Sequence, residues 1–159
     1  MADDASPTLD EEKRLPSASA RIIGGSNANL TQFPFFALIY FSGNPQCGGS
    51  LISTQWVLTA ARGLSGTQLS QLNNYAIYLG NLASQSPFST GSVKALPTAI
   101  FIHELYTAVN YQNNIALMQI PTVTLTANIQ PVTLAIDATN NFNGQVAFLM
   151  GFGRTADTG

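Results

Sequence analysis

The sequence is poor in the side chains from which most metal and acid–base sites are built. It contains one histidine, His103, and one cysteine, Cys47, and charged residues make up only 9% of its 159 residues. One imidazole, one thiol and scattered carboxylates offer no ligand spacing for a metal ion, so we expect neither a metal site nor a cofactor. The 6 lysines and arginines form no basic patch, which argues against a nucleic-acid partner.

Long apolar runs are also missing. No stretch is long and apolar enough to span a bilayer, and no apolar central run of a signal peptide occurs in this sequence. The net charge of −2 resides entirely in residues 1–21, whereas residues 22–159 carry equal numbers of acidic and basic side chains. Because this first segment is polar and interrupted by proline, we expect a disordered, propeptide-like tail over residues 1–21.

Apolar and aromatic residues gather in short runs separated by Gly, Pro, Asn and Ser, a pattern typical of antiparallel strands. Pro97 interrupts the longest run and indicates an edge or a bulge there. The sequence therefore predicts an all-β protein with an antiparallel barrel. The predicted strands are residues 35–41, 47–52, 56–59, 75–79, 93–102, 115–120 and 145–150. The predicted connections include residues 42–45, 63–74, 83–92 and 138–144.

Six short motifs follow one another between residues 21 and 159. They are Arg21-Ile22-Ile23-Gly24-Gly25, Cys47 to Ser53, Trp56 to Ala61, Ile102 to Tyr106, Asn113 to Leu117, and Gly151 to Thr155. In this order they resemble the motifs of the chymotrypsin/trypsin-like (S1) serine proteases. The resemblance implies a single six-stranded antiparallel Greek-key barrel over residues 22–150, like the N-terminal half of the two-barrel trypsin-like fold. Residues 151–159 then begin the link to a second barrel, which we expect to be absent.

The resemblance also marks the positions at which this sequence departs from the family. Arg62 stands where the family has its catalytic histidine, and Asn114 stands where it has the aspartate that orients this base. A guanidinium stays protonated at physiological pH and cannot accept a proton from a serine. The sequence ends at Gly159, before any segment that resembles the family's nucleophile motif, and His103 falls in a non-catalytic loop of the family. We therefore expect a truncated, catalytically inactive homologue without catalytic residues, and not an enzyme.

Three further candidate sites are Cys47, the Arg21–Ile22 bond and Asn29. In the family, the cysteine corresponding to Cys47 bridges to one that follows the catalytic histidine, and that position is Gly63 here. Cys47 is therefore expected to be unpaired and to pack as a small apolar side chain. The Arg21–Ile22 bond matches the family's activation junction, and Asn29-Leu30-Thr31 is a sequon for N-glycosylation if the protein is secreted.

Two classes of function agree with these features. The first is a pseudoprotease, extracellular by its family resemblance, that acts as a protein-binding or regulatory module. The barrel face that is covered in the two-barrel fold would then be open to a protein partner or to a second copy. The second is one half of a split or truncated serine endopeptidase that needs a second chain, and a non-functional fragment is a third alternative.

Overall fold

The computed structural model describes most of one compact unit of the chain. The described residues are 28–29, 31–64, 66–80, 91–137, 139 and 141–152. They belong to the unit Ser26–Phe152, and a second unit, formed by Met1–Gly25 and Gly153–Gly159, lies wholly outside them. The expected tail over residues 1–21 and the Arg21–Ile22 junction therefore fall outside the described residues.

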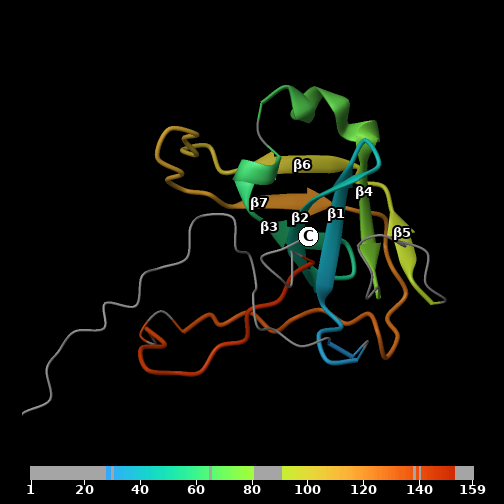
Figure 1. The fold of residues 1–159 in the computed structure, drawn as a ribbon, viewed down its shortest axis with the longest axis vertical. Coiled ribbons are helices and arrows are strands. Elements are labelled where there is room, and N and C mark those ends of the chain that lie inside the picture. Colours follow the sequence, from blue (N-terminus) through green and yellow to red (C-terminus); the bar gives the residue numbers. More distant parts are fainter. Residues whose placement is uncertain are drawn as a thin grey trace, which may run out of the picture. The chain divides into compact units, whose positions relative to one another are not determined.

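Seven strands form one antiparallel sheet with the order β5-β4-β1-β2-β3-β7-β6 (Figure 1). The strands are β1 Phe36–Phe41, β2 Asn44–Ser53, β3 Trp56–Thr59, β4 Tyr75–Leu79, β5 Val93–Ala95, β6 Ala99–Ile102 and β7 Ala116–Gln119. The only helical segments in the described residues are η1 Ala61–Gly63 and η2 Gly66–Asn74, both of the 3-10 type, and Gln71, with a non-helical φ of −112° and ψ of 44°, divides η2 by a kink. The all-β class that the sequence predicted is therefore confirmed.

The two edge strands of the sheet, β5 and β6, follow each other directly in the sequence. Residues 96–98 separate them. The interruption falls at Pro97 because proline has no N–H to donate to a ladder. Thr98 is already bonded to the neighbouring strand, since its N–H donates to the carbonyl of Gln119 at 2.8 Å. The run predicted as one strand over residues 93–102 is therefore two strands, and the sheet has seven strands where six were expected.

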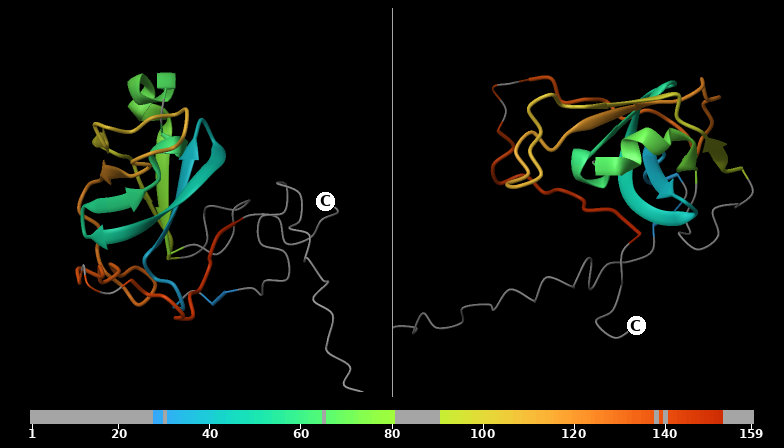
Figure 2. Two further views of the ribbon diagram at one scale, coloured as in Figure 1. Left: turned by 90° about the vertical axis from the view of Figure 1, so that its left-hand side faces the viewer. Right: turned by 90° about the horizontal axis from the view of Figure 1, so that it is seen from above.

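The sheet is curled rather than flat (Figure 2). β2 is the longest strand and pairs with both β1 and β3. Its ladder with β1 is irregular between Ile39 and Tyr40, and its ladder with β3 is irregular between Leu51 and Ser53. Such irregularities bend a strand and increase its twist. They help to curl the sheet around the core.

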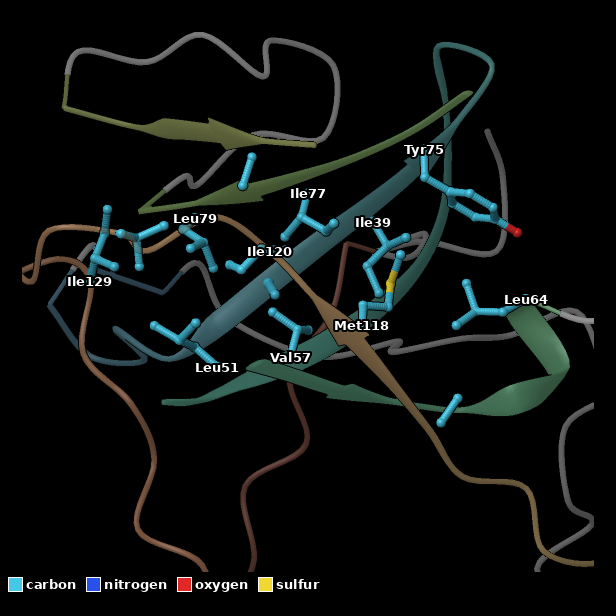
Figure 3. Packing of buried hydrophobic residues seen from close by; sticks show 14 of the residues in the cluster. Ile39, Leu51, Val57, Leu64, Tyr75, Ile77, Leu79, Met118, Ile120 and Ile129 are labelled. Carbon is cyan, nitrogen blue, oxygen red and sulfur yellow. The ribbon is translucent and has the colours of Figure 1, made fainter. Parts of the chain in front are cut away.

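The inner face of the sheet carries the main core (Figure 3). Tyr75, Ile77 and Leu79 alternate along β4 and are fully buried, as expected for side chains that share one face of a strand. They belong to the same cluster as Ile39 of β1 and Met118 of β7. Burial of one such side chain contributes about 1.5–3 kcal/mol. The core thus fixes the positions of β1, β4 and β7.

A smaller cluster lies on the other face of β1 and β4. It contains Leu38, Tyr40 and Tyr78, and Phe36 and Phe152 pack against it. The rings of Phe36 and Phe152 are 5.3 Å apart and meet edge to face, an arrangement that aromatic pairs favour. The end of the described chain therefore packs against the sheet through Phe152.

Two predicted segments differ from the structure. Residues 63–74 were expected to be an irregular connection, but Gly63 is the last residue of η1 and residues 66–74 form η2. The sequence did not indicate these helices, because a short polar stretch gives little periodic signal. Residues 145–150, expected to be a strand, belong to none of the strands of the described chain. Their apolar composition favours a strand, but a strand also needs a neighbour for its hydrogen bonds.

Candidate functional site

Two positions that are far apart in the sequence meet at the end of a strand pair. Arg62 lies in η1, soon after β3, and Asn114 lies just before β7. β3 and β7 are antiparallel, and Thr59 with Ala116 is the last pair of their ladder. The main-chain N–H of Arg62 donates to Oδ1 of Asn114 at 2.8 Å. The structure therefore brings together the two positions that the sequence analysis singled out.

The chemistry that Asn114 can offer at this place is limited. Its Oδ1 is occupied by the N–H of Arg62, and the other terminal group of an asparagine is an uncharged NH₂ donor. Such a group can neither accept an N–H from a base nor stabilise a positive charge on that base. Asn114 thus acts here as an acceptor for the main chain.

The guanidinium of Arg62 lies over an aromatic ring. Its central carbon is 4.8 Å from the ring centre of Tyr111, within the range of a cation–π interaction. Arg62 is an exposed residue, and Tyr111 is 48% exposed. A permanently protonated guanidinium in this position is a surface cation and cannot serve as a general base.

Tyr111 could not be recognised from the sequence, because its position depends on the conformation of a loop. Tyr111 and Asn113 have positive φ angles of 55° and 52°, which non-glycine residues seldom adopt. The side-chain amide of Asn113 donates to the carbonyl of Leu105 at 2.9 Å, and the N–H of Thr107 donates to the carbonyl of Gln112 at 3.2 Å. These cross-loop bonds hold the loop in which Tyr111 faces Arg62.

His103 has a structural role at the start of the same loop. Its Nδ1 accepts the N–H of Leu105 at 3.2 Å, and its own N–H donates to the carbonyl of Ile115 at 3.1 Å. The N–H of Tyr106 closes the turn by donating to the carbonyl of His103 at 2.9 Å. These bonds use His103 to shape the turn.

Cys47 faces the glycine at position 63. A Cβ built on Gly63 would lie 2.8 Å from the Sγ and 3.1 Å from the Cβ of Cys47. Cys47 is a free cysteine that is partly buried, and its Sγ is 3.8 Å from the hydroxyl of Thr59. Burial raises the pKa of the Cys47 thiol more than the contact with Thr59 lowers it. The thiol is therefore poorly suited to form a reactive thiolate.

Other predicted sites are placed as follows. Asn29 is exposed in a turn before β1. Within the part of the chain that the structure describes, no three side chains of His, Cys, Asp or Glu come together to hold a metal ion. No helix among the same residues is long and apolar enough to cross a membrane.

An apolar strip lies exposed near the end of the described chain. We define it by Val146, Phe148 and Leu149, whose exposed fractions are 90%, 73% and 79%. An aromatic contact links it to the body of the unit, since the ring centres of Phe148 and Phe33 are 6.3 Å apart. An exposed strip of large apolar side chains is typical of an interaction surface.

Comparisons with known proteins agree with the motif order. A family model described as Trypsin matches residues 22–159. The chain is 30% identical over 144 residues to transmembrane protease serine 7 of Homo sapiens, covering 89% of this chain and 17% of that protein. It is 32% identical over 143 residues to trypsin delta of Drosophila melanogaster, covering 89% of this chain and 53% of that protein. The chain thus spans about half the length of the fly protein and a much smaller share of the human one.

Proposed function

Since the chain belongs to the trypsin family, we propose that Arg62 and Asn114 occupy the positions of the family's general base and of the carboxylate that orients it. The observation that carries this proposal is the hydrogen bond of 2.8 Å from the main chain of Arg62 to Oδ1 of Asn114. In a serine protease of this type the orienting carboxylate bonds to the imidazole of the base, so the two residues must be neighbours. Arg62 also follows directly after one of the motifs that appear in family order, and Asn114 lies within another.

A domain with these two residues is not expected to catalyse proteolysis. The guanidinium of Arg62 remains protonated and cannot remove a proton from a serine hydroxyl. The amide of Asn114 cannot stabilise an imidazolium, and an aspartate-to-asparagine change at the orienting position lowers turnover about 10⁴-fold in a serine protease of this type. We therefore propose a non-catalytic homologue.

The same proposal assigns a protein-binding or regulatory role to the domain. The apolar strip supports it, because three large side chains in four residues are mostly exposed. The body of the chain from residue 22 onward is also electrically neutral, so little charge repulsion opposes contact with another protein. One relative is named as a transmembrane protease and another as a trypsin, and we take the extracellular setting of this domain from its resemblance to the family. The proposed role is accordingly extracellular.

Cross-linking in the fluid from which the natural protein is obtained tests the binding role. We expect the protein to be captured with one specific partner or with a second copy. Phe148→Ser should weaken this capture, whereas Val109→Ser, which changes a side chain that is 96% exposed elsewhere in the domain, should not. Equal capture of both variants would contradict a role for the strip in binding. A monomer that binds nothing would contradict the binding role itself.

A serine-directed fluorophosphonate tests the absence of catalysis. The purified protein should show no labelling, alone or mixed with a trypsin-family chain that carries a nucleophilic serine. Labelling that requires both chains and is lost when Arg62 is replaced would contradict the proposal. That result would instead support the alternative, in which this chain is one half of a proteolytic pair.

A further inference from the structure

The first described turn of the chain carries the one N-glycosylation sequon in the sequence, Asn29-Leu30-Thr31. We infer that Asn29 is the acceptor of an N-linked glycan that stands beside the apolar strip. Occupancy of this site in nature rests on the extracellular part of the proposed function, because the modification takes place on chains that enter the secretory pathway.

The turn presents both required side chains to solvent. It is closed by the N–H of Gln32, which donates to the carbonyl of Asn29 at 3.0 Å, and by the N–H of Asn29, which donates to Oε1 of Gln32 at 3.3 Å. Both bonds use the main chain of Asn29 and leave its amide group outside the turn. Asn29 and Thr31 are exposed, and within the described chain neither side chain makes a hydrogen bond. The amide nitrogen is therefore accessible for modification.

Other exposed asparagines of the domain differ in this respect. The side chain of Asn113 donates to a loop carbonyl, and that of Asn114 accepts the N–H of Arg62. Their amides are needed for the local structure, and neither has a Ser or Thr two residues later. Asn29 thus combines the sequon with an unengaged amide.

The turn is fixed to the body of the domain close to the apolar strip. Directly after it, the carbonyl of Pro34 accepts the N–H of Gln130 at 3.0 Å, and the carbonyl of Phe35 accepts the N–H of Leu51 at 2.8 Å. The turn is part of the blue segment that leads into β1 in Figure 1. Phe33 lies between the turn and these anchors, and its ring contacts Phe148. A glycan on Asn29 would therefore shield part of the strip and limit self-association.

The test has two arms that both use peptide-N-glycosidase F. In the first, the full chain is expressed behind a cleavable secretory leader in cultured eukaryotic cells. The enzyme should shift its mobility by one glycan. Asn29→Gln and Thr31→Ala should abolish the shift, whereas Thr31→Ser should retain it, because serine also completes a sequon. In the second arm, the same enzyme is applied to the natural protein.

A matched control separates failure of the site from failure to reach the glycosylation machinery. Thr122→Asn, made in the Asn29→Gln background, creates a sequon that ends at the exposed Thr124. If this control is glycosylated and the unaltered chain is not, the assignment of Asn29 is wrong. If the first arm succeeds and the natural protein shows no shift, the extracellular proposal fails and natural occupancy of Asn29 fails with it.

The shielding is tested on the secreted protein before and after removal of the glycan. Sedimentation should show more self-association for the deglycosylated protein and for Asn29→Gln. Adding Phe148→Ser should reverse this increase. Equal self-association with and without the glycan would overturn the placement of the glycan beside the strip, even if Asn29 is modified.

Discussion

Replacing Gly63 by cysteine should close a disulfide with Cys47. A Cβ at position 63 would lie 3.1 Å from the Cβ of Cys47, whereas the two Cβ atoms of a disulfide are about 3.5–4.5 Å apart. A relaxation of a few tenths of an ångström is therefore sufficient. Gly63 is at the end of a short 3-10 helix and does not have a positive φ, so a side chain at this position causes no backbone strain.

The size of the effect follows from the loop that the bridge closes. Loop-closure entropy for the segment from residue 47 to residue 63 contributes about 3 kcal/mol. Pushing apart two groups that start too close costs about 1 kcal/mol. The net gain of about 2 kcal/mol corresponds to a rise in Tm of roughly 8 °C for a domain of this size.

Gly63→Ser is the matched control, because it adds the same Cβ and a small polar atom without forming a bond. Its Cβ would meet the Sγ of Cys47 at 2.8 Å, so we expect it to be less stable than the unaltered protein. Thermal unfolding followed by circular dichroism, with and without a reductant, should place oxidised Gly63→Cys highest and the Ser variant lowest. Two free thiols under oxidising conditions would refute the geometry. A formed bridge with no rise in Tm over the unaltered protein would refute the energetic reasoning.

Three further predictions concern titratable groups. In the variant Arg62→His, the additional change Asn114→Asp should raise the pKa of the new imidazole by about 1 unit or more, because a nearby carboxylate favours the charged form of the imidazole. NMR titration with His103 as internal reference measures this pKa, and equal pKa values in the single and double variants would contradict the proposed pairing. Burial raises the pKa of Tyr75 to about 12, above its ordinary value near 10. The contribution of Tyr75 to the free energy of unfolding should therefore be constant below pH 10 and fall as the pH rises toward 12, and Tyr75→Phe should reduce the measured fall above pH 10 in denaturant titrations at each pH. Because burial raises the pKa of Cys47, its reaction with Ellman's reagent at pH 8 should be slower than in the unfolded protein, and an equal rate would show that the thiol is accessible.

Strands with strong local signals could be predicted from the sequence. β3 and β4 have the predicted limits, Trp56–Thr59 and Tyr75–Leu79, since each is a short, largely apolar run that begins directly after a polar residue. The break at Pro97 could also be anticipated, but not that it would create two edge strands. Residues 145–150 show the limit of such reasoning, because their composition predicts a strand whether or not a neighbouring strand exists.

The candidate site could be predicted in part. Motif order pointed to Arg62 and Asn114, which the structure joins by a hydrogen bond. It could not point to Tyr111, because the contact of this ring with Arg62 depends on a loop with two positive φ angles. The exposure of the turn at Asn29 likewise required coordinates, since a sequon alone does not show whether its amide is engaged.

The requirements of the fold at positions 62 and 114 differ from the requirements of proton transfer. The main-chain N–H of Arg62 requires only an oxygen acceptor, and Asn114 supplies one at 2.8 Å. A neutral hydrogen bond of this kind contributes about 1 kcal/mol, whereas a 10⁴-fold loss of turnover corresponds to about 5.5 kcal/mol of transition-state stabilisation. An amide at position 114 therefore preserves the contact beside the β3–β7 ladder although it cannot support a base. Because the same contact uses the main-chain N–H of residue 62, it does not depend on the side chain at this position, with the exception of proline, which has no N–H. Under the proposed assignment, the geometry that holds a base in the family instead presents a cation at the surface here, with the guanidinium of Arg62 over the ring of Tyr111.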